Sequence, residues 1–280
     1  MIKKILTKIL LNNFKSVFYI LIKSKYEFLL PDHINFVLKK NTPLGKKGEN
    51  IKLFFDQIIT PNVIKNGSWD IFIVNFIKKF SKKKISYSFI DVGANIGLMS
   101  RQILNAGIKI NSIFCFEPEI NNFLLLKKNV GFFKESFFFN FALGNTKKDK
   151  TKLYLDPLNK GNYSLSKQNI KKEYCYIKII SANTIIKKII RNNRVNNIIY
   201  KSDTQGKDIE IFLSLDADIL KKIKIICIEI SNFNFDKIDF LSKILEFKIM
   251  YDESGVKLNK NLLINKLEEK NEFNLLACRN

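Results

Sequence analysis

The segment from Phe89 to Gly97 constrains the fold of this chain more than any other. It reads FIDVGANIG, an apolar run with an acid near its end, then a turn that holds two glycines. Short apolar runs of this kind are typical of strands buried on both faces. Glycine lets the following turn close tightly and lets a ligand approach the backbone. The segment predicts a strand, a turn and a helix, with a pocket for a nucleoside-bearing cofactor where the strand ends.

The spacing of the glycines argues against a dinucleotide. If Gly93 opened a GxGxxG fingerprint, the other two glycines would fall at Asn95 and Leu98. The spacing D-x-G-x-N-x-G suits a cofactor that has no pyrophosphate and is held by an amino-acid end and sugar hydroxyls. Glu117 follows the next apolar run, where a carboxylate can accept hydrogen bonds from both ribose hydroxyls. The alternative for Glu117 is a surface acid before a turn proline.

Apolar runs and helical patterns alternate from residue 71 onward. Helices are expected at Ile71–Phe80, Leu98–Asn105, Asn121–Asn129 and Ile209–Asp216. Strands are expected at Tyr87–Val92, Ser112–Phe116, Phe137–Ala142, Thr151–Leu155, Tyr176–Ile180, Asn197–Ser202, Ile223–Ile230, Phe247–Tyr251 and Phe273–Cys278. This alternation predicts an α/β fold with a largely parallel sheet covered on both faces.

Six segments in order resemble one protein family. They are DVGANIG (91–97), CFEPEINNFLLLKKN (115–129), FALGN (141–145), GNYSL (161–165), KSDTQGKDIEIF (201–212) and IICIEI (225–230). Together they resemble the FkbM-type methyltransferases, a branch of the class I S-adenosylmethionine-dependent enzymes, over roughly Trp69 to Cys278. The resemblance implies a Rossmann-like, seven-stranded, mostly parallel sheet in residues 69–280, with residues 1–68 as an N-terminal helical appendage. It also implies S-adenosyl-L-methionine as the cofactor.

The resemblance assigns roles to individual positions. The methionine end of the cofactor is framed by Asp91, Gly93, Asn95 and Gly97, the ribose is held by Glu117, and the adenine is enclosed near Asn140 and Ala142. Asp203 closes the fourth strand next to the methyl-transfer centre, and Glu229 closes the fifth. Four positions depart from the family pattern: Asn183, Ser202, Gln205 and Asp208.

Methyl transfer to an alcohol needs alignment and benefits from a base. Asp203 is the candidate base and Glu229 the second. The alternative for Asp203 is an electrostatic contact with the amine of the cofactor, without proton transfer. His33 is the only histidine, which excludes HExxH zinc sites, and it is expected in a surface turn. The loop Gly161–Leu165 either lines the acceptor pocket or is an ordinary connection.

The net charge of +22 has two interpretations. Only four of the 48 basic residues are arginine, and AT-rich codon usage gives such a lysine-rich composition. Alternatively, the chain has an anionic partner. Because arginine dominates base and phosphate recognition, nucleic acid is not the expected partner. The resemblance favours a hydroxyl on a sugar, glycolipid or secondary metabolite as acceptor. An RNA methyltransferase and a non-catalytic binding protein are the alternatives.

The first 30 residues form a basic amphipathic pattern. Apolar residues recur at helical spacing from Ile2 to Leu21, with lysines mostly between them. This predicts a helix that either packs on the domain or makes peripheral contact with an anionic membrane. The four cysteines are far apart and suggest buried thiols in a reducing compartment. We therefore expect a cytoplasmic protein, with attachment at the inner membrane face as the alternative.

Overall fold

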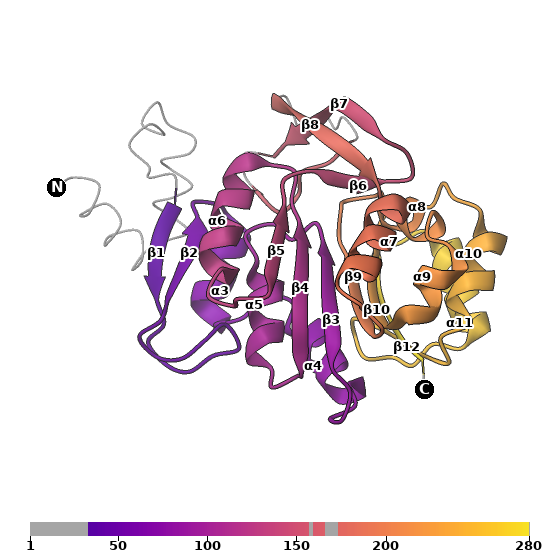
Figure 1. The fold of residues 1–280 in the computed structure, drawn as a ribbon, viewed down its shortest axis with the longest axis horizontal. Helices are drawn as coiled ribbons and strands as arrows, with labels where there is room; N and C mark the ends of the chain where they lie inside the picture. The colour runs from indigo at the N-terminus through magenta and orange to yellow at the C-terminus, as the bar shows by residue number, and fades with distance from the viewer. Residues whose placement is uncertain (1–32, 157–158, 166–172, 280) are drawn as a thin grey trace.

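A seven-stranded sheet forms the centre of the molecule (Figure 1). The computed structural model describes residues 33–156, 159–165 and 173–279. The strand order is β11-β12-β10-β9-β3-β4-β5. The bounds are β3 Tyr87–Val92, β4 Ile110–Phe116, β5 Ser136–Phe139, β9 Ile198–Ser202, β10 Ile223–Ile230, β11 Ile249–Asp252 and β12 Phe273–Cys278. Neighbouring strands from β5 to β10 run parallel, and β12 runs antiparallel to β10 and β11. The predicted α/β fold with a mostly parallel, Rossmann-like sheet is confirmed.

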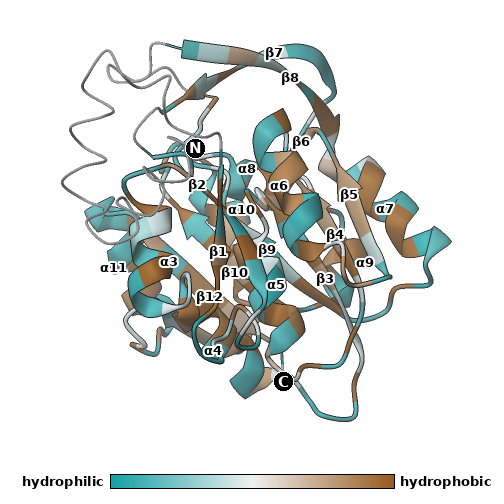
Figure 2. Ribbon diagram, turned by 90° about the vertical axis from the view of Figure 1, so that its left-hand side faces the viewer, coloured by the Kyte–Doolittle hydropathy of each residue, from teal (hydrophilic) through white to brown (hydrophobic). Residues whose placement is uncertain are grey.

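Helices cover both faces of this sheet. Every residue of β3 is buried, with Ile90 and Val92 packed into one apolar cluster and Tyr87 and Phe89 into the other. One face packs against α4 Ile71–Phe80, α5 Leu98–Asn105 and α6 Ile120–Val130. The other packs against α7 Ala182–Asn192, α8 Asp208–Leu213, α9 Ala217–Lys222, α10 Lys237–Ile244 and α11 Lys260–Glu269. The central strands are mainly hydrophobic in Figure 2, as two-sided burial requires.

A hairpin precedes the central sheet. It consists of β1 His33–Val37 and β2 Asn50–Phe54 and is followed by helix α3 Ile59–Asn66. Its apolar side packs against residues of α5 and α6 such as Leu98 and Leu125. The sequence predicted a helical appendage over residues 1–68, but the described part of it, residues 33–68, also contains this hairpin. His33 opens β1 rather than lying in a turn. The helix predicted over residues 1–30 lies outside the described residues.

A second, three-stranded sheet has the order β6-β8-β7, with β6 Ala142–Gly144, β7 Lys148–Leu155 and β8 Glu173–Ser181. The predicted strand Phe137–Ala142 is wrong in extent, because β5 ends at Phe139 and Ala142 begins β6 in this other sheet. The side-chain amide of Asn140 donates to the carbonyl oxygens of Glu117 and Pro118, at 3.0 Å each. These bonds fix the crossing, the point where the chain passes from the central sheet to the small sheet.

The predicted helix Ile209–Asp216 is also divided. Helix α8 ends at Leu213, and the Asp216 side chain accepts a hydrogen bond from Ile219 N to begin α9. A short polar side chain at this position competes for the backbone and ends one helix while capping the next.

No helix of the described chain is long and apolar enough to cross a membrane. Cys115, Cys227 and Cys278 are buried, and all four cysteines are free thiols.

Candidate functional site

A cavity of about 490 Å³ opens where β3, β4, β9 and β10 end. This volume falls in the range of small-molecule and cofactor sites. Its floor comes from the ends of the parallel strands, and its cover comes from the small sheet and from residues 159–163 and 165. The principal lining residues are Asp70, Gly93, Asn95, Phe116, Glu117, Asn122, Ala142, Leu153, Tyr163, Leu165, Ile177, Lys201, Asp203, Gln205, Glu229 and Glu272.

The turn after β3 depends on both of its glycines. Gly93 has a φ of +72°, and a Cβ there would lie 1.9 Å from the carbonyl oxygen of Asp203. Gly97 has a φ of +81°, and its Cβ would lie 2.6 Å from Val130 Cγ2. Glycine is required for the left-handed backbone and for these close approaches. The turn therefore packs directly against the loop after β9 on one side and against α6 on the other.

Glu117 directly follows β4 beside this turn and faces the cavity. Its carboxylate accepts hydrogen bonds from the backbone nitrogens of Asn95 and Glu119, both at 2.9 Å. Burial raises the pKa of Glu117 to about 8. The two backbone donors fix the carboxyl group at the junction of the two strand ends, where the sequence placed a ribose-binding acid.

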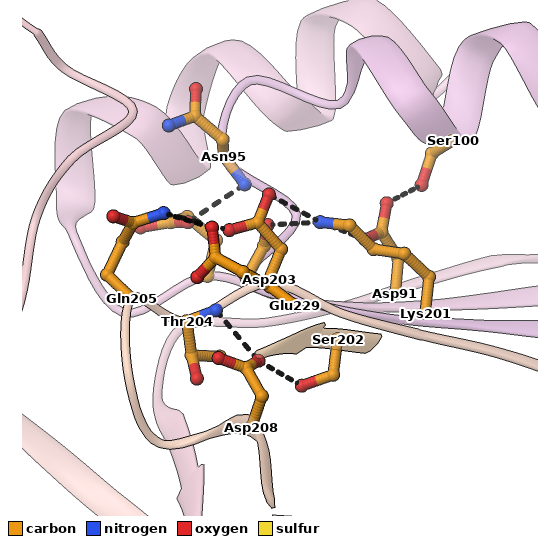
Figure 3. A network of polar contacts seen from close by, with 12 residues as sticks. Asp91, Asn95, Ser100, Lys201, Ser202, Asp203, Thr204, Gln205, Asp208 and Glu229 are labelled. Carbon is orange, nitrogen blue, oxygen red and sulfur yellow. Dashed lines mark hydrogen bonds and ion pairs between the residues drawn. The ribbon is translucent and has the colours of Figure 1, made fainter. Parts of the chain in front are cut away.

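Lys201 is the central cation of the site and was not predicted as a site residue. Its ammonium nitrogen lies 3.3 Å from Asp91 Oδ1, 3.6 Å from Asp203 Oδ2 and 3.1 Å from the carbonyl oxygen of Gly93 (Figure 3). Burial alone would lower the pKa of Lys201, but Asp91 and Asp203 together outweigh burial and raise it. Lys201 is therefore charged and ties the two acids to the glycine turn.

The sequence held part of a signal for Lys201, because it is a charged residue that follows three apolar or aromatic residues of a predicted strand. The register of β3 and β9, which places it opposite Asp91, is seen only in the structure. Asp91 itself is fully buried, and Ser100 donates to its other oxygen at 2.6 Å. Asp91 does not line the cavity. It holds Lys201, which does.

Three polar side chains form a chain along the ends of β9 and β10. The amide nitrogen of Gln205 donates to Asp203 Oδ1 at 3.1 Å and to Glu229 Oε1 at 3.0 Å (Figure 3). Burial, followed by the nearby charges of Asp203 and Asp208, raises the pKa of Glu229 to about 10. Glu229 thus carries a proton at neutral pH. Asp70 also faces the cavity, and burial raises its pKa to about 6.

Two of the departures from the family pattern contact each other. The Ser202 hydroxyl donates to Asp208 Oδ1 at 2.5 Å, and Thr204 N donates to the same oxygen at 2.9 Å. Asp208 is buried, and burial raises its pKa to about 6. This pair shapes the loop that carries Asp203. Asn183 lies elsewhere, where its side chain accepts from Asp216 N at 3.1 Å.

Of the predicted site residues, six line the cavity: Gly93, Asn95, Glu117, Ala142, Asp203 and Glu229. Three do not: Asp91 lies behind the turn, Gly97 lies in the turn and faces α6, and Asn140 holds the segment between β5 and β6. In the loop Gly161–Leu165, every residue except Ser164 lines the cavity, whereas its role in an acceptor pocket stays a prediction. Asn95 secures this loop through its side-chain amide, which donates to the Lys160 carbonyl oxygen at 2.9 Å. No group of three or more potential ligand side chains is placed to hold a metal ion among the residues described.

Known proteins resemble this chain only distantly. No protein-family model and no curated protein matches it. Among solved structures, methyltransferase FkbM from Methylobacillus flagellatus KT is 16% identical over 69% of this chain and 44% of its own, with a TM-score of 0.41. TrmK of M. capricolum, solved with S-adenosyl-homocysteine, is 13% identical over 74% of this chain and 66% of its own, with a TM-score of 0.36. A protein of the NADB-Rossmann superfamily from Streptococcus agalactiae is 12% identical over 74% and 67%, with a TM-score of 0.37.

Proposed function

We propose that this protein is an S-adenosylmethionine-dependent methyltransferase, of the FkbM type, that methylates a hydroxyl oxygen of a sugar, glycolipid or secondary metabolite. One observation carries the proposal. The glycine turn after β3, the acid that ends β4 and the acids that end β9 and β10 all meet at one cavity. The six family-like segments of the sequence support the choice of cofactor and of acceptor class.

The residues of the cavity fit this cofactor. Glu117 offers a carboxyl group for the ribose hydroxyls, and its fixed orientation comes from two backbone donors. The carboxyl groups of Asp70 and Asp203 suit the positive charge of the amino-acid end and of the sulfonium. Phe116 and Ala142 supply apolar walls for the adenine ring of the cofactor. Gly93 lets the turn after β3 and the loop that carries Asp203 approach each other at the cavity, because a Cβ at Gly93 would clash with the Asp203 carbonyl oxygen.

When bound, the cofactor supplies an electrophilic methyl group, so the protein has to align the acceptor and accept the proton that the acceptor hydroxyl loses. Asp203 is the better base. It is an acid about one third exposed toward the cavity, whereas Glu229 already holds a proton at neutral pH. Gln205 orients Asp203 and links it to Glu229. Asp203 would take the proton that the acceptor hydroxyl loses, and Lys201 holds that side chain in place.

Asp203→Asn tests the role of the base. The substitution keeps the size of the side chain and removes its ability to take a proton, so we expect turnover to fall by about a hundredfold or more, in line with general-base contributions. Transfer of a labelled methyl group from the cofactor to a panel of hydroxylated sugars and glycolipids measures turnover, and calorimetry measures cofactor affinity. If Asp203→Asn lowers affinity alone, Asp203 is a cofactor contact. If no hydroxyl accepts the methyl group and the wild type binds no cofactor, the proposed function is wrong.

A further inference from the structure

The small sheet has two unlike faces. On one face, Leu153 and Ile177 line the cavity. Side chains alternate along a strand, so their neighbours point the other way. The register places Lys152 opposite Tyr176 and Tyr154 opposite Tyr174 on that outer face. We call this the Lys/Tyr face, and it comprises Lys150, Lys152, Tyr154, Tyr174, Tyr176 and Lys178.

Lysines and tyrosine rings interleave on this face. The ammonium of Lys150 lies 4.1 Å from the ring centre of Tyr176, and that of Lys152 lies 4.1 Å from the ring centre of Tyr174. The two rings meet edge to face at 5.5 Å. Tyr174 is 44% exposed and Tyr176 is 53% exposed, so the two neighbouring rings form one exposed aromatic surface with a polar edge.

The face is also positively charged. Asp149 is the nearby acid, and it pairs with Lys147 at 3.5 Å and with Lys178 at 3.7 Å. Lys150 and Lys152 have no ion pair among the described residues, and their ammonium groups lie over one face of Tyr176 and of Tyr174, from which a base or a phosphate can displace these flexible side chains. Figure 2 shows β7 and β8 together at the top edge of the molecule, with hydrophilic stretches along β7.

We infer that the Lys/Tyr face binds a single-stranded polynucleotide. Exposed aromatic rings on a sheet offer stacking platforms for bases, and neighbouring lysines attract the phosphates. A membrane surface fits less well, because insertion relies on protruding aliphatic or tryptophan side chains. The exposed aliphatic residues of the described chain, such as Ile120, Ile238 and Val256, lie on other elements.

This inference departs from the expectation drawn from composition. An aromatic and basic module was not visible in the sequence, because β7 and β8 contribute to it from segments separated by residues 156–172. Strand pairing brings them together. The inference goes beyond the proposed function and does not require it, since the face lies on the side of the sheet turned away from the cavity.

A binding assay with a matched pair of variants tests the inference. Fluorescence anisotropy follows a labelled single-stranded oligouridylate, and separately an oligothymidylate, titrated with the full chain over a series of salt concentrations. Lys150→Gln with Lys152→Gln is compared with Lys83→Gln with Lys84→Gln. The second pair removes the same charge from an exposed run between α4 and β3, at the opposite end of the molecule from β7 (Figure 1). We expect the first pair to weaken binding about tenfold and to flatten the log–log salt dependence by about 1.4. The second pair should change affinity by less than about twofold.

Tyr174→Leu with Tyr176→Leu tests stacking. Each lost stacking contact should weaken binding by about fivefold or more. Thermal unfolding and S-adenosylmethionine affinity should stay at the wild-type values in all these variants, which separates failure of this inference from failure of the proposed function. Equal losses from the two lysine pairs, unchanged binding in the tyrosine variant, or binding to phosphatidylserine vesicles with none to either oligonucleotide would overturn it.

Discussion

Lys201 is the residue on which the geometry of the site depends. It is a buried cation held between two acids and a backbone carbonyl, and it connects β3 with β9. A buried ion pair adds little net stability when intact, but removing one partner leaves a charge without compensation. The value of this pair therefore lies in fixing where Asp203 and the glycine turn stand relative to each other.

Lys201→Met should be strongly destabilising for this reason. We expect the free energy of unfolding to fall by about 3 to 5 kcal/mol, because Asp91 keeps its buried charge. Adding Asp91→Leu removes that charge and should recover most of the stability without restoring cofactor binding. Urea unfolding of the two single variants and the double variant measures the coupling. Strictly additive losses would show that the two side chains do not act as a pair.

Glu229 makes stability depend on pH. An unfolded glutamate titrates near pH 4.3, whereas the pKa of Glu229 in the fold is about 10. Between these values the folded protein holds a proton that the unfolded chain has released, so the free energy of unfolding falls as pH rises. The contribution is at most about 1.4 kcal/mol per pH unit.

Glu229→Gln should therefore flatten the fall in stability between pH 6 and 9 and make the variant more stable than the wild type at pH 9. Chemical denaturation at a series of pH values measures this. The exposed Glu173→Gln is the control and should leave the slope unchanged. A wild-type slope in Glu229→Gln would mean that Glu229 is ionised in the fold.

The turn between β3 and α5 shows how an element is fixed by its neighbours. Gly93 and Gly107 both have positive φ values, +72° and +75°. A Cβ at Gly93 meets the Asp203 carbonyl oxygen, whereas a Cβ at Gly107 has open space within 4 Å. An alanine at either position would be strained by the positive φ, but only an alanine at Gly93 would also clash with a neighbouring loop.

Gly107→Ala should cost about 1 kcal/mol of stability and leave cofactor binding intact, because the strain is local. Gly93→Ala should cost more and should weaken cofactor binding at least tenfold, since the loop that carries Asp203 must move. Thermal unfolding and calorimetry compare the two. Equal behaviour of the two variants would show that the approach of the two loops is unimportant for the site.

Elements with continuous burial were predictable from the sequence, and elements set by local side-chain bonds were not. The apolar runs of β3, β10 and β12 and the helical periods of α4 and α5 give the observed bounds residue for residue. The crossing at Asn140 and the cap at Asp216 divide what looked like single elements. Helices α7, α9, α10 and α11 were not predicted, and α9 has only six residues, too few for a clear period.

For the molecule as a whole, the fold and the position of the site follow from the order of strands and turns. The acids and glycines that end parallel strands meet because those strands share one edge of the sheet. Contacts that depend on the register between neighbouring strands could not be predicted from the sequence. The Asp91–Lys201 pair and the Lys/Tyr face both depend on which residues lie opposite each other on neighbouring strands.

Every catalytic role proposed above requires that this cavity binds S-adenosylmethionine with Glu117 on the ribose. Titration calorimetry of the cofactor into the wild type and Glu117→Ala measures this binding. We predict one binding site per chain in the wild type and an affinity about tenfold or more weaker in Glu117→Ala, as expected for the loss of two hydrogen bonds to the carboxyl group. Absence of binding to the wild type, or equal affinity in the two proteins, would mean that the cavity does not hold the cofactor in this way.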